Sequence, residues 1–245
     1  MDLQGKVALV TGGAVRVGRA IVLALADSGA DIVLIYNASA AEAAATCAEV
    51  VGRGRQALAH RADIAQVAEA QGMVAAAVER FGRLDILVNS ASVWTRTRMG
   101  EVDEATWDRV TGVALKGSFF AAQAAAPHLA AHGEGLIVNV VDASVFQPFP
   151  NHIVHTVAKA GLLNMTYALA LELAPGVRVN AVAPGPVLPP PGSSPAETLA
   201  AAHRTLLGRW GRAADVAQAV VYLAQADYVT GIVLPVDGGQ RLSRR

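Results

Sequence analysis

Three side chains able to bind or release a proton lie within one short segment of the chain, residues 139–159. They are Asp142, His155 and Lys159. An imidazolium can act as a general acid near neutral pH, although a neighbouring ammonium such as that of Lys159 disfavours its charged form. Contact with the Asp142 carboxylate would offset this effect and restore the pKa of His155 to about 6.5 or above. The segment therefore predicts a proton-donor group formed by Asp142 and His155, with Lys159 beside it.

A metal site is a second chemistry that this segment could support. His152 and His155 are three residues apart near an expected helix start, a spacing that can bind a metal ion. No third ligand is evident unless Asp142 is recruited. We therefore predict no metal site and assign Asp142 and His155 to proton transfer.

Strand and helix patterns alternate along the chain and would position these residues. Short apolar, β-branched runs predict strands at 6–11, 31–36, 56–60, 84–89, 135–141, 177–182 and 232–236. Helical periodicity predicts helices at 16–28, 40–51, 65–80, 103–132, 153–173 and 213–225. This alternation implies right-handed crossovers between parallel strands. We therefore predict one α/β domain, residues 1–245, with a doubly wound parallel sheet of about seven strands flanked by helices.

Residues 184–195 form a proline-rich, irregular stretch between two of the expected strands. A long structureless loop within a compact domain is commonly functional. We expect this stretch to be an ordered loop over a binding site.

Composition restricts the class of protein. Apolar residues make up 53% of the chain and charged residues 16%, which suits a sheet buried on both faces. Acidic and basic residues balance at 20 each, so no overall field favours nucleic acid or an anionic membrane. The single cysteine, Cys47, cannot form a disulfide within the chain, and no apolar run approaches the ~20 residues that span a bilayer. We expect a cytoplasmic protein that binds neither nucleic acid nor membrane.

A glycine-rich turn, residues 11–18, joins the first expected strand to the first expected helix. Gly12 and Gly18 would let the backbone approach a pyrophosphate at the helix N-terminus, where free N–H groups favour anions. A tight turn that binds nothing is the alternative. The position directly after the N-terminal strand favours dinucleotide binding.

The residues after the second expected strand bear on which dinucleotide is bound. An acidic residue there would hydrogen-bond the ribose hydroxyls of NAD and repel a 2′-phosphate. This chain instead has Tyr36, Asn37 and Ser39, and Arg16 of the first turn can reach the same region. A cation without a carboxylate predicts NADPH/NADP⁺ as the cofactor. The alternative for Arg16 is a solvated loop charge.

Over nearly its full length the chain resembles the short-chain dehydrogenases/reductases. The matching stretches are 11–13 with Gly18, 63–64, 89–92, 180–185, 237–239 and the expected helix that contains Lys159. The resemblance implies a Rossmann fold. The residues that it and the preceding patterns assign to the cofactor are Gly12, Arg16, Val17, Gly18, Tyr36, Asn37, Ser39, Asp63, Ile64, Asn89, Ser90, Ala91, Ser92, Lys159, Pro184, Gly185 and Val187.

The resemblance also implies how the cofactor lies. Asp63 and Ile64 would flank the adenine, and residues 89–92 would lie along the cofactor. Pro184–Gly185 and Val187 would border the nicotinamide.

Within that family the chain is most similar to the pteridine reductases. Arg16 stands where those enzymes have an arginine for the 2′-phosphate, and Asp142 stands where most family members have a serine. Ser92 and Trp94 match a serine and an aromatic residue that face the pterin. The resemblance implies that Trp94 stacks on the substrate, with half-buried packing as the alternative, and that Ser92, Asp142 and His155 also bind the substrate.

The chain departs from the family at its catalytic tetrad, which is Asn, Ser, Tyr and Lys. The corresponding residues here are Ala114, Asp142, His155 and Lys159, so only the lysine is standard. Ala114 is expected to interrupt the water-mediated proton path that the asparagine supports. We assign Asp142, His155 and Lys159 as the catalytic residues.

These patterns together predict an NADPH-dependent reductase that transfers hydride to a pterin-like substrate such as a dihydropteridine or dihydrofolate. One alternative is a reductase of ketones or 3-oxoacyl groups. Another is a catalytically degenerate protein that binds NADP(H) and reduces nothing. By resemblance, the protein is expected to form a homotetramer or a homodimer.

Overall fold

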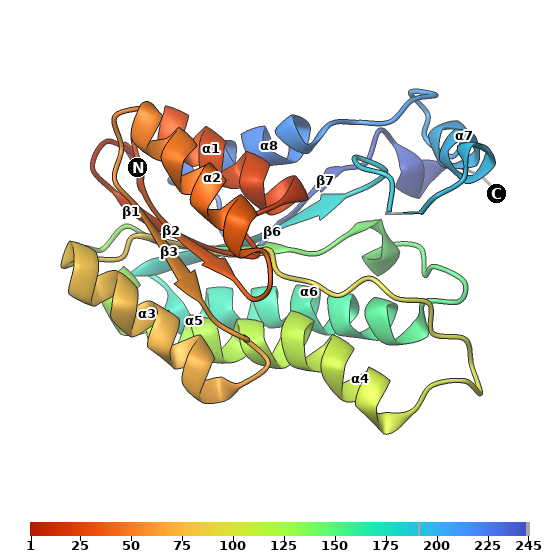
Figure 1. Cartoon of the computed structure of the whole chain (residues 1–245), viewed down its shortest axis with the longest axis horizontal. Coiled ribbons are helices and arrows are strands. Elements are labelled where there is room, and N and C mark those ends of the chain that lie inside the picture. Colours follow the sequence, from red (N-terminus) through yellow and green to blue (C-terminus); the bar gives the residue numbers. More distant parts are fainter. Residues whose placement is uncertain (191, 244–245) are drawn as a thin grey trace.

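A parallel sheet of seven strands forms the middle layer of the molecule (Figure 1). The structure is a computed structural model that describes residues 1–190 and 192–243. The strand order is β3-β2-β1-β4-β5-β6-β7, so the order reverses between β1 and β4. The strands are β1 (Val7–Thr11), β2 (Asp31–Tyr36), β3 (Ala57–Arg61), β4 (Ile86–Asn89), β5 (Gly135–Val140), β6 (Val177–Pro184) and β7 (Val233–Val236).

Helices cover both faces of this sheet (Figure 1). One face carries α1 (Arg16–Asp27), α2 (Ala40–Gly52) and α8 (Ala213–Gln225). The opposite face carries α3 (Val67–Phe81), α5 (Ser118–Ala130) and α6 (Ile153–Leu173). Two shorter helices, α4 (Glu104–Thr111) and α7 (Pro195–His203), complete the set of α-helices in the described ranges. The arrangement confirms the predicted single-domain, doubly wound Rossmann fold.

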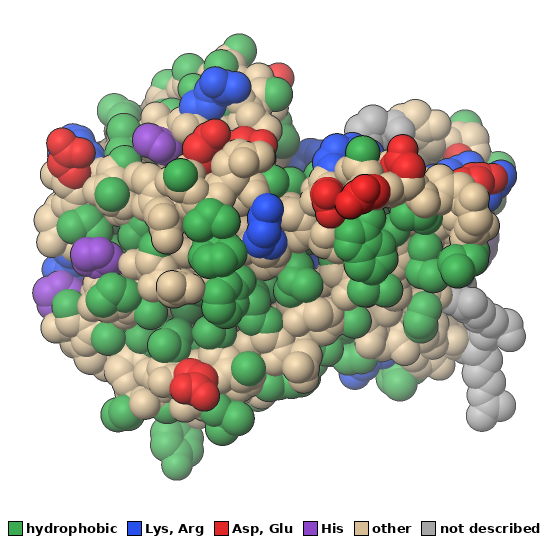
Figure 2. All heavy atoms as spheres, turned by 90° about the horizontal axis from the view of Figure 1, so that it is seen from below, with side chains coloured by type: hydrophobic (Ala, Val, Ile, Leu, Met, Phe, Trp, Pro, Cys, Tyr) green, Lys and Arg blue, Asp and Glu red, His purple; other side chains and the backbone are tan. Residues whose placement is uncertain are grey.

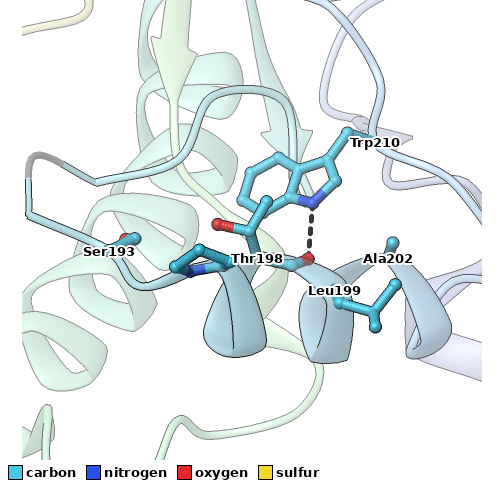
Figure 3. A pocket seen from close by; sticks show the side chains of 6 residues that line it. Ser193, Thr198, Leu199, Ala202 and Trp210 are labelled. Atoms are coloured by element: carbon cyan, nitrogen blue, oxygen red, sulfur yellow. Dashed lines mark hydrogen bonds between the residues drawn. The ribbon is translucent and has the colours of Figure 1, made fainter.

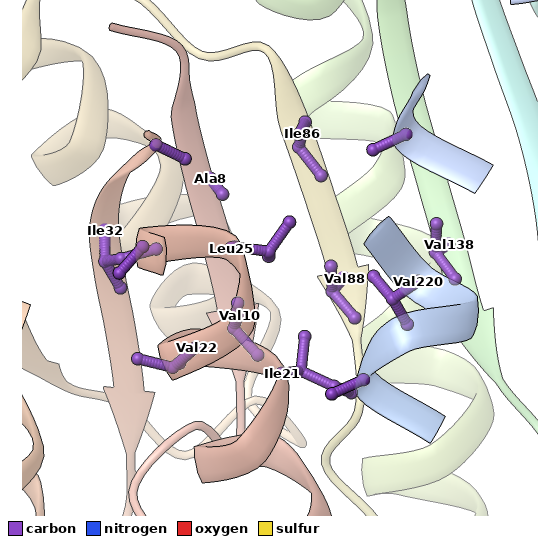
Figure 4. Packing of buried hydrophobic residues seen from close by; sticks show 14 of the residues in the cluster. Ala8, Val10, Ile21, Val22, Leu25, Ile32, Ile86, Val88, Val138 and Val220 are labelled. Carbon is purple, nitrogen blue, oxygen red and sulfur yellow. The ribbon is translucent and has the colours of Figure 1, made fainter. Parts of the chain in front are cut away.

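The core explains why the strands read as continuous apolar runs. In β1, Ala8 and Val10 face α1 and α8, whereas Val7 and Leu9 face α3 and α5. Every second side chain therefore packs on a different helical layer. Figure 4 shows the first of these layers, in which Leu25 and other α1 side chains meet β1, β2 and β4.

The helical pattern predicted over much of residues 103–132 is confirmed, with one irregularity in the middle. The expected helix 103–132 is α4 followed by a π-helix, Gly112–Gly117, and then α5. The π-helix lies against the turn after β3, where a Cβ atom on Gly117 would come within 2.4 Å of the carbonyl oxygen of Ile64. Such widened turns occur mostly at functional sites, and this one contains Ala114.

The proline-rich stretch contains a helix that the sequence reasoning missed. It begins as a loop after β6 and enters α7 at Pro195. Ser194 and Glu197 form a capping box at this end, which is a sequence signal that was available. Pro191 lies outside the described residues.

None of the helices in the described ranges has both the length and the apolar character needed to cross a membrane.

Candidate active site

The predicted catalytic residues meet beyond the carboxyl end of β5. Asp142 is the second residue after this strand and accepts a hydrogen bond from the backbone N–H of Ser144, 2.9 Å away. His155 and Lys159 come from the first two turns of α6 and are four residues apart, so both lie on the helix face turned toward Asp142. Open α/β sheets bind ligands at the carboxyl ends of their strands. These three residues therefore lie where a ligand-binding site is expected in this fold.

Asp142 is bonded through both carboxylate oxygens. Its Oδ2 atom contacts Nε2 of His155, and its Oδ1 atom accepts from the hydroxyl of Ser144. On its other side, His155 places Nδ1 3.3 Å from the carbonyl oxygen of Val93. The contact between Asp142 and His155 that the proton-donor hypothesis requires is therefore present in the structure.

These bonds define where the protons are. A carbonyl oxygen only accepts, so the contact with Val93 places a hydrogen on Nδ1 of His155. The Nε2–Oδ2 contact needs a second proton between imidazole and carboxylate. Burial alone would raise the pKa of Asp142. The hydrogen bond and charge of His155, the charge of Lys159 and the hydrogen bond of Ser144 all lower it. Together they outweigh burial, so the pKa of Asp142 is lowered. Asp142 is therefore the carboxylate that accepts the hydrogen bond from Nε2 of His155.

Lys159 is buried close to this pair. Its ammonium donates to the carbonyl oxygen of Val140 at 2.7 Å. Burial lowers the pKa of Lys159, and the charge of Asp142 acts against this shift.

The position of the family's asparagine is closed by apolar side chains. Ala114 is fully buried and packs with Val110, Val154 and Ala158. Its carbonyl oxygen accepts from the hydroxyl of Ser118 at 3.0 Å. No polar side chain is supplied from this position, which agrees with the expected interruption of the proton path.

Trp94 lies beside the catalytic pair in a small ring cluster. His152 stacks on its indole at 4.3 Å between ring centroids, with an interplanar angle of 25°. His155 and Phe149 make edge contacts with it at 4.7 and 6.0 Å. Trp94 is 45% exposed, but one ring face is already covered by His152. Only the remaining exposed surface of the indole is available to a substrate.

Two sets of contacts connect the Trp94 segment to neighbouring elements. Thr97 accepts from the backbone N–H of Val154 at 3.2 Å and so holds the segment on the first turn of α6. Arg96 forms an ion pair with Glu197 of α7 at 3.1 Å. A hollow of about 470 Å³ lies beside α7. Figure 3 shows side chains that line it, among them Trp210, which donates to the carbonyl oxygen of Thr198 at 2.8 Å.

The glycine-rich turn forms a cradle that a side chain would fill. A Cβ atom on Gly18 would lie 2.1 Å from the carbonyl oxygen of Gly12. Gly12 has φ +63°, and a Cβ atom on it would lie 3.0 Å from the Cα atom of Ala91. Thr11, which was not assigned to the site from sequence, accepts from the N–H groups of Ser90 and Ala91 at 3.0 and 3.1 Å. These residues fit a dinucleotide pyrophosphate.

Other predicted cofactor residues surround this cradle. Gly185 abuts Asp237, where a Cβ atom would come within 2.7 Å of the Asp237 Cα atom. Asn89 is turned into the core, and its amide donates to Asn139 Oδ1 at 2.9 Å, so only its backbone can reach a cofactor. Of the remaining positions, Tyr36 and Pro184 end β2 and β6, and Val17 is in the first turn of α1. The others lie in the segments that follow strands: Asn37, Ser39, Asp63, Ile64, Ser92 and Val187.

Arg16 makes contacts that the sequence did not suggest. Its guanidinium donates to the carbonyl oxygens of Leu188 and Pro189 at 3.1 and 3.0 Å. At the end of β2 a different cation is present, because Arg61 donates to the carbonyl oxygen of Asn37 at 3.1 Å.

Among the described residues, no group of three His, Cys, Asp or Glu side chains is arranged to hold a metal ion.

The family follows from comparison with known proteins. The family model described as enoyl-(acyl carrier protein) reductase matches residues 13–241. The chain belongs to the short-chain dehydrogenase/reductase family, a class of NAD(P)-dependent oxidoreductases. An uncharacterized oxidoreductase of Methylorubrum extorquens AM1 is 40% identical, covering 98% of this chain and 99% of the relative. A 3-oxoacyl-[acyl-carrier-protein] reductase of Staphylococcus aureus is 34% identical, covering 96% and 97%.

Solved structures agree with this assignment. FolM alternative dihydrofolate reductase 1 from Brucella canis, solved with NADP, has a TM-score of 0.94 at 34% identity and covers 100% of this chain and 97% of its own. Carveol dehydrogenase from Mycobacterium avium, solved with NAD, has a TM-score of 0.92 at 28% identity and covers 98% and 99%. Both similar structures hold a nicotinamide dinucleotide, which supports such a cofactor for this chain.

Proposed function

We propose that this protein is an NADPH-dependent reductase of a planar, pterin-like substrate. The observation that carries the proposal is the Asp142–His155 ion pair beside Lys159, where most family members have a serine and a tyrosine. The likeness to a dihydrofolate reductase solved with NADP supports the substrate class and the cofactor. The nicotinamide would supply hydride, and the protein's own residues would supply the proton.

Asp142 is the member of the pair placed to pass that proton on. Its side chain is 17% exposed, whereas that of His155 is 3% exposed with both ring nitrogens bonded. A proton leaving Nε2 of His155 moves first onto Oδ2 of Asp142. From there it can reach a heteroatom of the substrate. In this proposal His155 stores the proton and Asp142 transfers it.

Lys159 sets the balance of this transfer. Its positive charge repels the imidazolium of His155, which favours release of the proton, and it lowers the pKa of Asp142, so that Asp142 passes the proton to the substrate and does not keep it. Negative charge that develops on the substrate would likewise be attracted to the Lys159 ammonium. Lys159 therefore acts without giving up its own proton.

A carbonyl reductase acting on 3-oxoacyl groups is the second candidate. The 34% identity with a 3-oxoacyl-[acyl-carrier-protein] reductase favours it, as does the largely apolar hollow beside α7. A third candidate is an NADP(H)-binding protein without turnover. The apolar surroundings of Ala114 and the doubly bonded ring of His155 favour that candidate.

We also propose that the protein self-associates. Large apolar side chains are exposed on the helical layer that holds α4, α5 and α6: Trp107, Phe119, Val157, Tyr167 and Leu171. Figure 2 shows hydrophobic side chains gathered across this side of the molecule, with few charges between them. A second copy of the chain would cover such a surface in a homodimer or homotetramer.

A substrate panel distinguishes the three candidate functions. NADPH absorbance would be followed with dihydrobiopterin, dihydrofolate and a 3-oxoacyl thioester over a pH series from acidic to neutral. The proposal predicts NADPH consumption with the dihydropterins. Consumption with the thioester alone would favour the second candidate, and tight NADPH binding without consumption would favour the third.

A further inference from the structure

Arg61 occupies a position at the end of β3 that the proposed cofactor would need to meet. β3 pairs with β2 in parallel, and Arg61 is in register with Tyr36, the last residue of β2. The residues two and four positions before it, Ala59 and Ala57, pack in the core layer beneath α2. Because side chains alternate along a strand, Arg61 extends from that same face at the carboxyl end of the sheet.

The guanidinium of Arg61 lies across the tip of β2. Its Nε atom donates to the carbonyl oxygen of Asn37 at 3.1 Å, and this is its one hydrogen bond among the described residues. In a doubly wound fold, the residue at the tip of this strand meets the adenosine ribose of a bound dinucleotide. The guanidinium of Arg61 is therefore bonded to the part of β2 that this ribose would approach.

The charges around Arg61 are arranged to accept an anion. Three other arginines on this side of the sheet are paired with carboxylates: Arg19 with Glu49, Arg53 with Asp27 and Arg55 with Asp31. Within the described ranges Arg61 has no such ion pair, and Tyr36-Asn37-Ala38-Ser39 brings no carboxylate to the tip of β2. An exposed arginine held by one backbone contact retains most of its donors for a ligand.

Arg16 is already occupied elsewhere. Its guanidinium bonds the carbonyl oxygens of Leu188 and Pro189, in the loop that leads toward α7. The two arginines thus have separate partners, one in the loop after β6 and one at the end of β2.

We infer that Arg61 is the residue that recognises the 2′-phosphate of NADPH, and that Arg16 mainly holds the loop after β6. A planar guanidinium binds phosphate oxygens through parallel hydrogen bonds, which a ribose hydroxyl cannot match. The inference rests on the proposed use of NADPH and names the residue responsible for it. It gives no role to the catalytic pair, so it can be tested by binding alone.

The test measures binding of NADPH and NADH, and of adenosine 2′,5′-bisphosphate and ADP, to the full-length protein by calorimetry. Arg61→Ala should weaken NADPH and the 2′,5′-bisphosphate by about 10- to 100-fold, the effect of losing hydrogen bonds between charged groups, and NADH and ADP by less than about 3-fold. Arg61→Lys should fall between wild type and Arg61→Ala. Arg109→Ala, which removes an exposed arginine of α4, controls for overall charge.

The outcomes separate this inference from the proposed function. If wild type prefers NADPH and Arg61→Ala keeps that preference while Arg16→Ala loses it, the inference is overturned and the proposed cofactor stands. If wild type prefers NADH or binds neither nucleotide, the proposed cofactor fails and the inference with it. Circular dichroism of each variant checks that the protein is folded.

Discussion

His155 directs Nε2 at the carboxylate of Asp142 and Nδ1 at a backbone carbonyl oxygen, so neither ring nitrogen faces a substrate directly. A tyrosine in this position would carry its single hydroxyl to the reacting atom. The histidine instead forms a buried ion pair with a residue that is itself more exposed. Under the proposed function, the group that gives the proton to the substrate would be Asp142, after β5, and not the residue on α6.

Substitution of Asp142 by Asn should remove the transferring group while keeping its shape. We expect NADPH oxidation to fall by about 10²- to 10⁴-fold, the usual contribution of general acid catalysis. NADPH binding, measured by fluorescence, should change little. Because the variant leaves His155 without its buried partner, the free energy of unfolding should also fall by about 3 kcal/mol. A variant that binds NADPH, is folded and retains full activity would exclude Asp142 as the donor.

Substitution of His155 by Gln keeps a hydrogen-bond donor toward Asp142 but removes the titrating group. We expect the rate to fall and to lose its dependence on pH between acidic and neutral values. The comparison variant is His152→Gln, whose ring also contacts Trp94 but not Asp142. The account fails at this point if His152→Gln abolishes the pH dependence and His155→Gln leaves it intact.

Trp94 and Trp107 offer a matched pair of tryptophans, 45% and 44% exposed. Trp94→Ala should weaken a dihydropterin by about 3- to 10-fold through the lost stacking contact. Its effect on a small ketone should be smaller. Trp107→Ala on α4 should leave both unchanged in the monomer. Equal losses from the two variants would mean that Trp94 packs against the protein and does not stack on the substrate.

Acid should destabilise wild type more than the Asp142→Asn variant. The pKa of Asp142 is lowered in the folded protein, chiefly because the effects of His155 and Lys159 outweigh burial. Its stabilising contribution is therefore complete above the unfolded value of about 3.9 and is lost as pH falls through the lower folded value. Thermal unfolding across this range should show the difference between wild type and variant shrinking below about pH 4. A constant difference would contradict the shift.

The fold was predictable because the sheet is buried on both faces. The segment 31–36, for example, reads as six residues of which five are apolar, and it is β2 in the structure. The π-helix at Gly112–Gly117 was not predictable in this way. It depends on the close approach of Gly117 to Ile64, which no local periodicity records.

The pairing of Asp142 with His155 was predictable because β5 and α6 follow each other in the chain. Spacing could not reveal that Val93 holds the other ring nitrogen, nor that His152 covers one face of Trp94, since these contacts join distant segments. Arg61 was missed for a similar reason. It reaches the tip of β2 from β3, and sequence alone does not give the register of two strands.

The most direct test of the account is the pH dependence of NADPH oxidation with a dihydropterin, measured under single-turnover conditions for wild type and His155→Gln. The account predicts a wild-type rate that rises as pH falls below neutral, because the proton is stored on His155, and a flat, slower profile for the variant. Identical profiles, or no NADPH consumption by wild type at any pH, would contradict a proton donor formed by Asp142 and His155.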